Sequence, residues 1–191
     1  MSNNTLEINS HNFILIIGPS GCGKTSLIKH LSLIDGISTI SLDEDLSQLI
    51  KREFNLSIYD FISRNGSDDF CRLAIKYLEN QHALLKNICV VDVGAGFLES
   101  DSVFELLRMY SSITLWVNPN ESYRRFMTKN LPEKFKNRDL GEYVNTEFSE
   151  RRERIYKSTS IFCDTTNMST EETFVMLRDC IFSRPPEKHL S

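Results

Sequence analysis

The chain has no surplus of basic residues, no paired cysteine pattern and no long apolar run, and each absence excludes a class of protein. Its 22 Lys and Arg stand against 26 Asp and Glu, a formal net charge of −4, so we expect no nucleic-acid partner. Its five cysteines are scattered, odd in number and without metal-type spacing, which favours free buried thiols in a reducing cytoplasm. No apolar run approaches the length of a membrane span, and no signal-peptide pattern precedes the first apolar run, so we expect no membrane partner.

What the chain does have is enough apolar sequence to form one core. With 191 residues and 40% apolar content, we expect a single domain over residues 1–191, a monomer, with a loosely held tail over 183–191. Short apolar runs predict five strands, at 13–17, 36–41, 88–93, 113–117 and 160–164. Longer segments with helical spacing separate them, for example Phe70, Leu73, Ala74, Tyr77 and Leu78. Strands that alternate with helices predict an α/β fold with a parallel sheet covered on both faces.

The segment from Gly18 to Thr25, GPSGCGKT, satisfies the pattern G-x-x-x-x-G-K-[ST] at every fixed position. An apolar run precedes it and an amphipathic segment follows it, which is the strand, loop and helix setting of a phosphate-binding loop. Its glycines let backbone N–H groups surround phosphate oxygens, while Lys24 reaches the β- and γ-phosphates and Thr25 ligates Mg²⁺. We therefore expect the chain to bind a nucleoside triphosphate. The predicted contacts are Gly18, Ser20, Gly21, Cys22, Gly23, Lys24, Thr25 and Ser26.

Acidic residues follow the second and third predicted strands, at the sheet edge where ligands of open α/β sheets bind. After the second strand, Asp43 could serve the metal and Asp45 could be a base for an incoming hydroxyl; alternatively these acids only favour a helix N-terminus. The third strand closes on Asp92, which is either a metal partner or a hydrogen-bonded turn former. Gly94 and Gly96 follow it and allow a close approach of the backbone to a ligand.

Basic residues gather after the fourth predicted strand. They are Arg124, Arg125, Lys129, Lys134, Lys136 and Arg138. They form either a solvated helix face or a mobile cationic lid over about residues 122–142, which would stabilise a migrating phosphoryl group and exclude water. Further along, one of Arg151, Arg152 and Arg154 could hold an anionic substrate by a bidentate contact.

In their order and spacing these motifs resemble those of the shikimate kinases over about residues 13–181. The DED segment at 43–45 resembles the family's D-x-D, and SIYDFI at 57–62, followed by Gly66 and Phe70, is similar to S-I-x-x-I/F-F and G-E-x-x-F-R-x-x-E. GAG at 94–96 lies where the family has three glycines. RERIY at 152–156 resembles R-x-P-L-Y, and the Asp-Thr pair at 164–165 resembles V-D-T.

The resemblance implies a three-layer α/β/α P-loop kinase fold with a five-stranded parallel sheet and a mobile lid. It implies transfer of the γ-phosphate of MgATP to a hydroxyl of shikimate. Lys24 would then be catalytic, Thr25, Asp43 and Asp92 would serve the metal, and Arg125 would be the lid arginine beside the nucleotide. The implied acceptor contacts are Asp45, which would hold or deprotonate the hydroxyl, with Gly94, Ala95, Gly96 and Arg152.

The chain also departs from the family pattern, mainly on the acceptor side. Cys71 and Ala74 stand where the family has an arginine and a glutamate, and Ala95 replaces a glycine. The lid motif R-P aligns either with Leu131-Pro132, which lacks the arginine, or with Arg138. The sequence thus predicts a kinase for shikimate or a related hydroxylated metabolite. The alternatives are a non-catalytic, regulatory nucleotide-binding relative and a phosphotransferase acting on a nucleoside or nucleotide, although the sequence offers no base-recognition residues.

Overall fold

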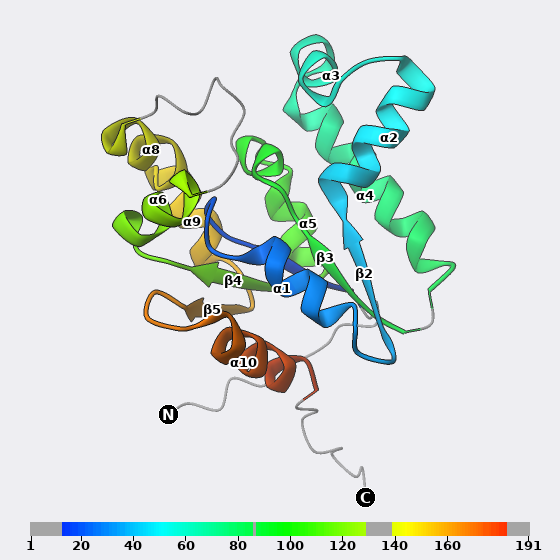
Figure 1. Cartoon of the computed structure of the whole chain (residues 1–191). Coiled ribbons are helices and arrows are strands. Elements are labelled where there is room, and N and C mark those ends of the chain that lie inside the picture. Colours follow the sequence, from blue (N-terminus) through cyan, green and yellow to red (C-terminus); the bar gives the residue numbers. More distant parts are fainter. Residues whose placement is uncertain (1–12, 86, 129–138, 183–191) are drawn as a thin grey trace, which may run out of the picture.

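In the computed structural model, which describes residues 13–85, 87–128 and 139–182, five parallel strands form one sheet in the order β2-β3-β1-β4-β5 (Figure 1). The strands are β1 (Phe13–Ile17), β2 (Ile37–Ser41), β3 (Ile88–Asp92), β4 (Ser111–Trp116) and β5 (Ile161–Asp164). The predicted parallel sheet and its five strands are confirmed, and only the ends of some strands differ from the predicted ones.

The largest of these differences is at the start of β4. The strand begins at Ser111, because Ser111 and Ser112 are buried and continue the pairing with β1. The backbone N–H of Ser112 donates to Ser160 Oγ at 3.2 Å, so a polar pair replaces the apolar residues that marked the other strands. A pattern based on apolar runs misses such a strand end, because buried serines satisfy their hydrogen bonds locally.

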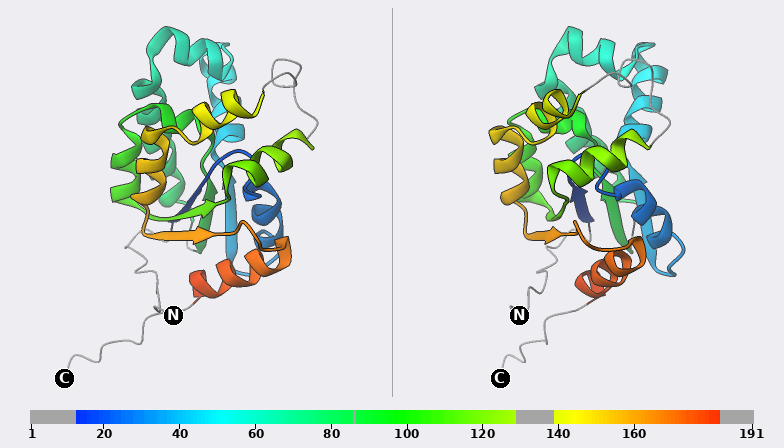
Figure 2. Two further views of the ribbon diagram at one scale, coloured as in Figure 1. Left: turned by 90° about the vertical axis from the view of Figure 1, so that its left-hand side faces the viewer. Right: turned by 60° about the vertical axis from the view of Figure 1, so that its left-hand side comes forward.

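Helices cover both faces of the sheet. They are α1 (Lys24–Leu31), α2 (Leu42–Phe54), α3 (Ile58–Asn65), α4 (Ser67–His82), the 3₁₀ helix η1 (Ala95–Glu99), α5 (Val103–Met109), α6 (Pro119–Met127), α8 (Leu140–Glu147), α9 (Glu150–Lys157) and α10 (Thr170–Phe182). Two apolar cores lie against the sheet, one under α1 and α10 and one under α2, α4, α5 and α9, and a third, smaller cluster lies between α6 and α8. Figure 2 shows these helices around the sheet. β1 is apolar along its whole length because both of its faces are buried, whereas the two edge strands β2 and β5 are only partly buried.

The topology brings four chain segments to one edge of the sheet. β1 lies between β3 and β4, so the loop after it opens in the middle of that edge. The starts of α2, η1 and α6 follow β2, β3 and β4 at the same edge, because carboxyl ends of parallel strands coincide there.

Parts of the predicted lid and tail lie outside the described residues. These are residues 129–138, which include Pro132 and Arg138, and residues 183–191. Among the helices that the structure describes, none combines the length and the apolar composition that crossing a membrane requires.

Candidate active site

The loop between β1 and α1 is pressed against the backbones of β4 and α6, and this contact requires glycine. A Cβ on Gly18 would overlap the carbonyl oxygen of Leu115, and one on Gly21 would come within 2.5 Å of Ser122 O. Gly21 also has a φ of +88°, a conformation that side chains disfavour. The loop therefore has the tight curl that the motif predicts. Two of its backbone N–H groups are already engaged, because Ser20 N–H donates to Glu147 and Cys22 N–H donates to Pro19 O.

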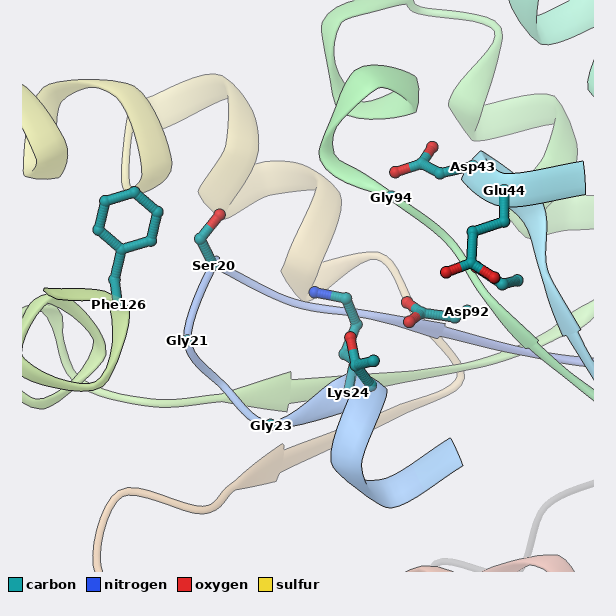
Figure 3. Close-up of a pocket in the computed structure, with 11 residues that line it drawn as sticks. Ser20, Gly21, Gly23, Lys24, Asp43, Glu44, Asp92, Gly94 and Phe126 are labelled. Atoms are coloured by element: carbon teal, nitrogen blue, oxygen red, sulfur yellow. The ribbon is translucent and has the colours of Figure 1, made fainter. Parts of the chain in front are cut away.

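The loop forms one wall of a cavity of about 390 Å³ (Figure 3), which we call the phosphate cavity. α2 and the segment after β3 form the facing wall, so predicted residues from three segments meet here. The cavity is lined by Ser20, Gly21, Gly23, Lys24, Thr25, Ser41, Asp43, Glu44, Asp92, Gly94 and Phe126. Phe126 and Ser41 are lining residues that no motif indicated; an aromatic residue on a basic helix, in particular, carries no distinguishing signal.

Lys24 is the only Lys or Arg side chain among the described residues that line this cavity, and both its backbone and its ammonium group are held in place. It begins α1, and its Nζ donates to Gly18 O at 2.8 Å and lies 3.7 Å from Cys22 Sγ. Burial lowers the pKa of the ammonium, but the Cys22 sulfur and the carboxylates of Asp92 and Glu147 outweigh that effect and raise the pKa above its ordinary value. Lys24 is thus held charged where an anionic ligand would enter.

Asp43 faces Lys24 across the phosphate cavity and packs directly on Gly94, where any Cβ would overlap its carboxylate. Burial raises the pKa of Asp43, and the nearby Asp92 raises it further, while Lys24 lowers it. α2 begins at Leu42, so Asp43, Glu44 and Asp45 also occupy its first turn, where acids favour the helix N-terminus. Both interpretations of Asp43, as a residue that favours the helix terminus and as one that faces a ligand, fit the structure.

The side chains between the phosphate loop and α2 suit Mg²⁺. Thr25, Asp43 and Asp92 present the oxygen donors that this ion prefers. Among the described residues, no group of three or more His, Cys, Asp or Glu side chains converges as a metal cage. That fits a nucleotide-bound Mg²⁺, which takes one or two carboxylates and completes its shell with phosphates and water.

The structure does not bring Asp45 into the phosphate cavity. Two residues along a helix corresponds to about 200° of rotation, so Asp45 points away from the side that Asp43 faces. Its carboxylate accepts a 2.8 Å hydrogen bond from the Tyr77 hydroxyl of α4. It lines an adjoining cavity of about 300 Å³ that shares Thr25 and Asp92 with the phosphate cavity. Its predicted role as base stays a prediction.

A second cavity of about 360 Å³ lies on the other side of the phosphate loop. It contains the predicted Cys22, Ser26 and Arg125, together with residues from α6 and from the loop before α10. Arg125 Nε donates to Glu121 at 2.7 Å and its Nη2 donates to Thr166 O at 3.3 Å. Hydrogen bonds from Arg124 and Arg125 lower the pKa of Glu121 to about 2. Met168 and Ser169 before α10, and Thr170 and Thr173 in its first turn, also line this cavity, and only the Asp-Thr pair ahead of them indicated this contribution.

Arg152 is buried and already paired, with 6% of its side chain exposed. Its Nη1 lies 2.9 Å from Glu147 Oε1, and its Nη2 donates to Glu99. Burial lowers the pKa of Arg152, but Glu147 and Glu99 raise it and prevail. Glu147 also accepts from the backbone N–H of Ser20 at 2.9 Å, which ties this pair to the phosphate loop. Neither glutamate carried a sequence signal, because they meet Arg152 only in the folded chain.

Cys71 and Ala74 are fully buried in the core that lies between α4 and η1. Phe70 and Phe97 stack beside them with ring centroids 4.6 Å apart, and the Cys71 thiol lies 3.9 Å from Phe97 O. Burial raises the pKa of this thiol. Ala95, which with Gly96 was predicted to contact the acceptor, begins η1 directly after Gly94.

The sheet order, the phosphate loop and the cavity together define a P-loop kinase fold. Shikimate kinase from Bacteroides thetaiotaomicron matches with a TM-score of 0.66 at 19% identity, covering 87% of this chain and 96% of that one. Shikimate kinase from Acinetobacter baumannii, solved in complex with shikimate, matches with a TM-score of 0.65 at 16% identity over 90% of this chain and 93% of its own. These likenesses show the fold.

Comparison of sequences identifies the family. A family model described as shikimate kinase matches residues 20–181, so the chain belongs to the shikimate kinase family. The pentafunctional AROM polypeptide of Scheffersomyces stipitis is 26% identical over 102 residues, which are 53% of this chain and 6% of that relative. The chain thus spans only a small part of the length of that protein.

Proposed function

We propose that the chain transfers the γ-phosphate of MgATP to a hydroxyl group of shikimate or a related hydroxylated metabolite. The observation that carries the proposal is the placement of Lys24 opposite Asp43 and Asp92 in one cavity at the phosphate loop. A cation on one wall and oxygen donors for a metal on the other are the parts that phosphoryl transfer requires.

The residues would divide the work by location. The N–H groups of the loop and Lys24 would hold the phosphates, and Lys24 would stabilise the charge that develops on the transferred group. Thr25, Asp43 and Asp92 would hold Mg²⁺, which when bound neutralises charge on the phosphates. The second cavity, beside Arg125, would take the rest of the nucleotide.

For the acceptor, the family likeness proposes Asp45 as the group that holds or deprotonates the hydroxyl. Its carboxylate already accepts from Tyr77, so an acceptor has to enter the adjoining cavity between Thr25 and Glu44 to reach it. Asp43 lies nearer to Lys24, and the two carboxylates can be distinguished by separate Asp→Asn variants.

Release of ADP, coupled to an optical assay, tests the proposal with a panel of hydroxy acids and uncharged polyols, shikimate first. We expect at least one acceptor to raise ADP release well above slow hydrolysis, and Asp45→Asn to remove that increase. Asp69→Asn on the exposed part of α4 is the matched control. Failure of every acceptor to raise turnover would contradict the proposal.

The alternative is a regulatory relative that binds ATP and transfers nothing. The buried Cys71 and Ala74 favour it, because two residues of the family's acceptor motif are part of an apolar core here. Tight nucleotide binding without transfer to any acceptor, and an unchanged cellular role in Asp45→Asn, would support this alternative over the kinase.

We further propose that the protein acts as a monomer in the cytoplasm without a nucleic-acid or membrane partner. Its five free cysteines support a reducing compartment, since four of them are buried as thiols. Sedimentation of the purified protein would measure the oligomeric state.

A further inference from the structure

Charged side chains connect the two walls of the phosphate cavity without being among the described residues that line it. On one wall, the Ser20 N–H donates to Glu147 Oε2 at 2.9 Å. Glu147 Oε1 lies 2.9 Å from Arg152 Nη1, and Arg152 Nη2 donates to Glu99. Glu99 ends η1, the 3₁₀ helix that starts directly after Gly94 on the facing wall (Figure 3). We call Glu147, Arg152 and Glu99 the ion-pair chain.

The inner part of the ion-pair chain is buried. The Arg152 and Glu147 side chains are 6% and 7% exposed, whereas 55% of the Glu99 side chain is exposed. Removing one partner of a buried ion pair is costly, but the intact pair often adds no net stability over well-packed apolar side chains. What this chain does provide is a fixed connection, because it joins α8 and α9 to the phosphate loop on one side and to η1 on the other.

The charge of Glu147 also acts on Lys24 inside the cavity. The Glu147 carboxylate is one of the groups that raise the pKa of Lys24. Removing only this negative charge would favour an incoming anion. Breaking the connection would have the opposite effect on phosphate binding, because the loop would lose order that binding then has to restore. The two roles of Glu147 therefore predict effects of opposite sign.

We propose that Glu147, Arg152 and Glu99 are positioning residues that hold the phosphate loop at a fixed distance from the segment after β3, ready for the nucleotide phosphates. The inference rests on the proposed function for the ligand of the phosphate cavity, and it goes beyond that function by assigning the ion-pair chain to nucleotide binding. The family likeness assigns Arg152 to the acceptor, whereas in the ion-pair chain Arg152 acts on the loop through Glu147 and Ser20.

Calorimetric titration of the full chain with a non-hydrolysable MgATP analogue tests the inference without requiring turnover. We expect Glu99→Gln and Glu147→Gln each to weaken binding of the analogue by about ten-fold, the equivalent of one charged hydrogen bond. Gln at position 147 keeps an amide oxygen for the Ser20 N–H, so its effect reports the ion pair. Glu153→Gln, which removes the exposed pair with Lys157 on the same helix as Arg152, is the control. A merely structural role would lower the melting temperature and leave the affinity of the folded protein unchanged.

Two further variants test whether the three side chains act as one unit. The double variant Glu99→Gln, Glu147→Gln should weaken binding by less than the product of the two single effects, because either change alone breaks the connection. Arg152→Lys should retain part of the affinity that is lost in Arg152→Met, since lysine keeps the charge but not the two-pronged geometry.

The inference is overturned if Glu99→Gln binds the analogue as well as wild type, or if Glu147→Gln binds it more tightly, which would show that Glu147 acts only through its charge. Glu99→Gln decides the matter if Glu147→Gln does not fold, because Glu99 is the exposed member of the chain. An Arg152→Lys variant with a raised KM for the acceptor and an unchanged nucleotide affinity would also overturn it and would place Arg152 at the acceptor.

The ADP-release assay separates this inference from the proposed function. Weaker binding of the analogue by the variants, together with no turnover of any acceptor, would leave the inference standing and remove the kinase proposal. Unchanged binding by the variants, together with turnover by wild type, would remove the inference and leave the kinase proposal standing. A wild-type chain that does not bind the analogue would overturn both.

Discussion

At the scale of single residues, the phosphate cavity depends most on Lys24. Its ammonium is held by Gly18 O and lies among the negative groups Asp92 and Glu147, so its position is fixed before any ligand binds. A group fixed in this way costs little reorganisation when charge develops on the phosphoryl oxygens, and its contribution is therefore greatest in the transition state.

We predict that Lys24→Met lowers kcat by about two to three orders of magnitude, the usual cost of one transition-state donor. The free energy of unfolding should fall by about 1–3 kcal/mol, because the variant loses the hydrogen bond to Gly18 O and leaves nearby carboxylates without their counter-charge. Steady-state kinetics and denaturant unfolding measure the two quantities, with Lys76→Met on the exposed face of α4 as control. Unchanged turnover would remove Lys24 from the site.

A second residue-scale prediction concerns Gly94. Gly94→Ala would place a Cβ inside the space of the Asp43 carboxylate, which must then leave its position opposite Lys24. We expect Mg²⁺-dependent nucleotide binding to weaken about ten-fold or more, the equivalent of at least one charged contact, while the fold is retained. Gly141→Ala, which adds a methyl group away from the cavity, is the control; its Cβ would lie 3.2 Å from Asp139 Oδ1, the N-cap of α8. Titration with and without Mg²⁺ measures the effect, and equal affinities in the two variants would contradict it.

Residue types and strand ends were enough to predict the grouping of Lys24, Thr25, Asp43 and Asp92. A parallel sheet brings the residues that follow its strands to one edge, so residues directly after different strands lie close together in the folded protein. The orientation of Asp45 could not be predicted this way, because it depends on where α2 begins: a start at Leu42 turns Asp45 toward Tyr77. The ion-pair partners of Arg152, Glu99 and Glu147, could not be predicted from the sequence either, because ion pairs between separate helices depend on how the helices pack.

At the scale of elements, α8 is connected to the phosphate loop. The hydroxyls of Tyr143 and Ser122 both contact the carbonyl oxygen of Ser20 and lie 2.7 Å from each other. The Phe126 ring packs at a tilt against Tyr143 with ring centroids 5.0 Å apart, so α6 and α8 approach the loop as one packed unit. Movement of these helices would therefore change the loop that faces the phosphates.

We predict that Tyr143→Phe loosens the phosphate loop without disrupting the packing of α8. Loss of the hydroxyl should lower the free energy of unfolding by about 0.5–1.5 kcal/mol, the value of a net hydrogen bond. Amide exchange in the loop should become faster, which a purely packing role would not produce. Tyr59→Phe, on an exposed residue of α3, is the control. Unchanged exchange would show that α8 does not restrain the loop.

The sequence predicted elements better than it predicted their contacts. Apolar runs located β1 and β3 because these strands are buried on both faces. The start of β4 was missed because Ser111 and Ser112 are buried polar residues, and the contacts of α8 were missed because Tyr143 and Glu147 belong to no recognised motif.

At the scale of the whole molecule, the fold places two carboxylates, Asp43 and Asp92, close together, and a bound metal ion would relieve the repulsion between them. Asp43 and Asp92 share one wall, and the negative charge of Asp92 disfavours the ionisation of Asp43. Stability, metal binding and pH are therefore linked through this wall.

The last prediction follows from the direction of that linkage. Burial raises the pKa of Asp43 in the folded state, and Asp92 and Glu44 raise it further against the opposing effect of Lys24. The folded protein therefore holds the Asp43 proton to a higher pH than the unfolded chain does, and stability falls as pH rises from the unfolded pKa of about 4 through the raised folded value.

Without metal, Asp43→Asn should melt above wild type at pH 7, with the difference vanishing below about pH 4 where both forms are neutral. MgATP at about 100 times its Kd should raise the free energy of unfolding of wild type by about 2.7 kcal/mol and that of Asp43→Asn by less. The difference between their melting temperatures should therefore narrow or change sign. Thermal melts across pH, with Glu153→Gln as control, measure this; a variant that is less stable than wild type at pH 7 without metal would contradict it, because the carboxylate would then be stabilising in its charged form.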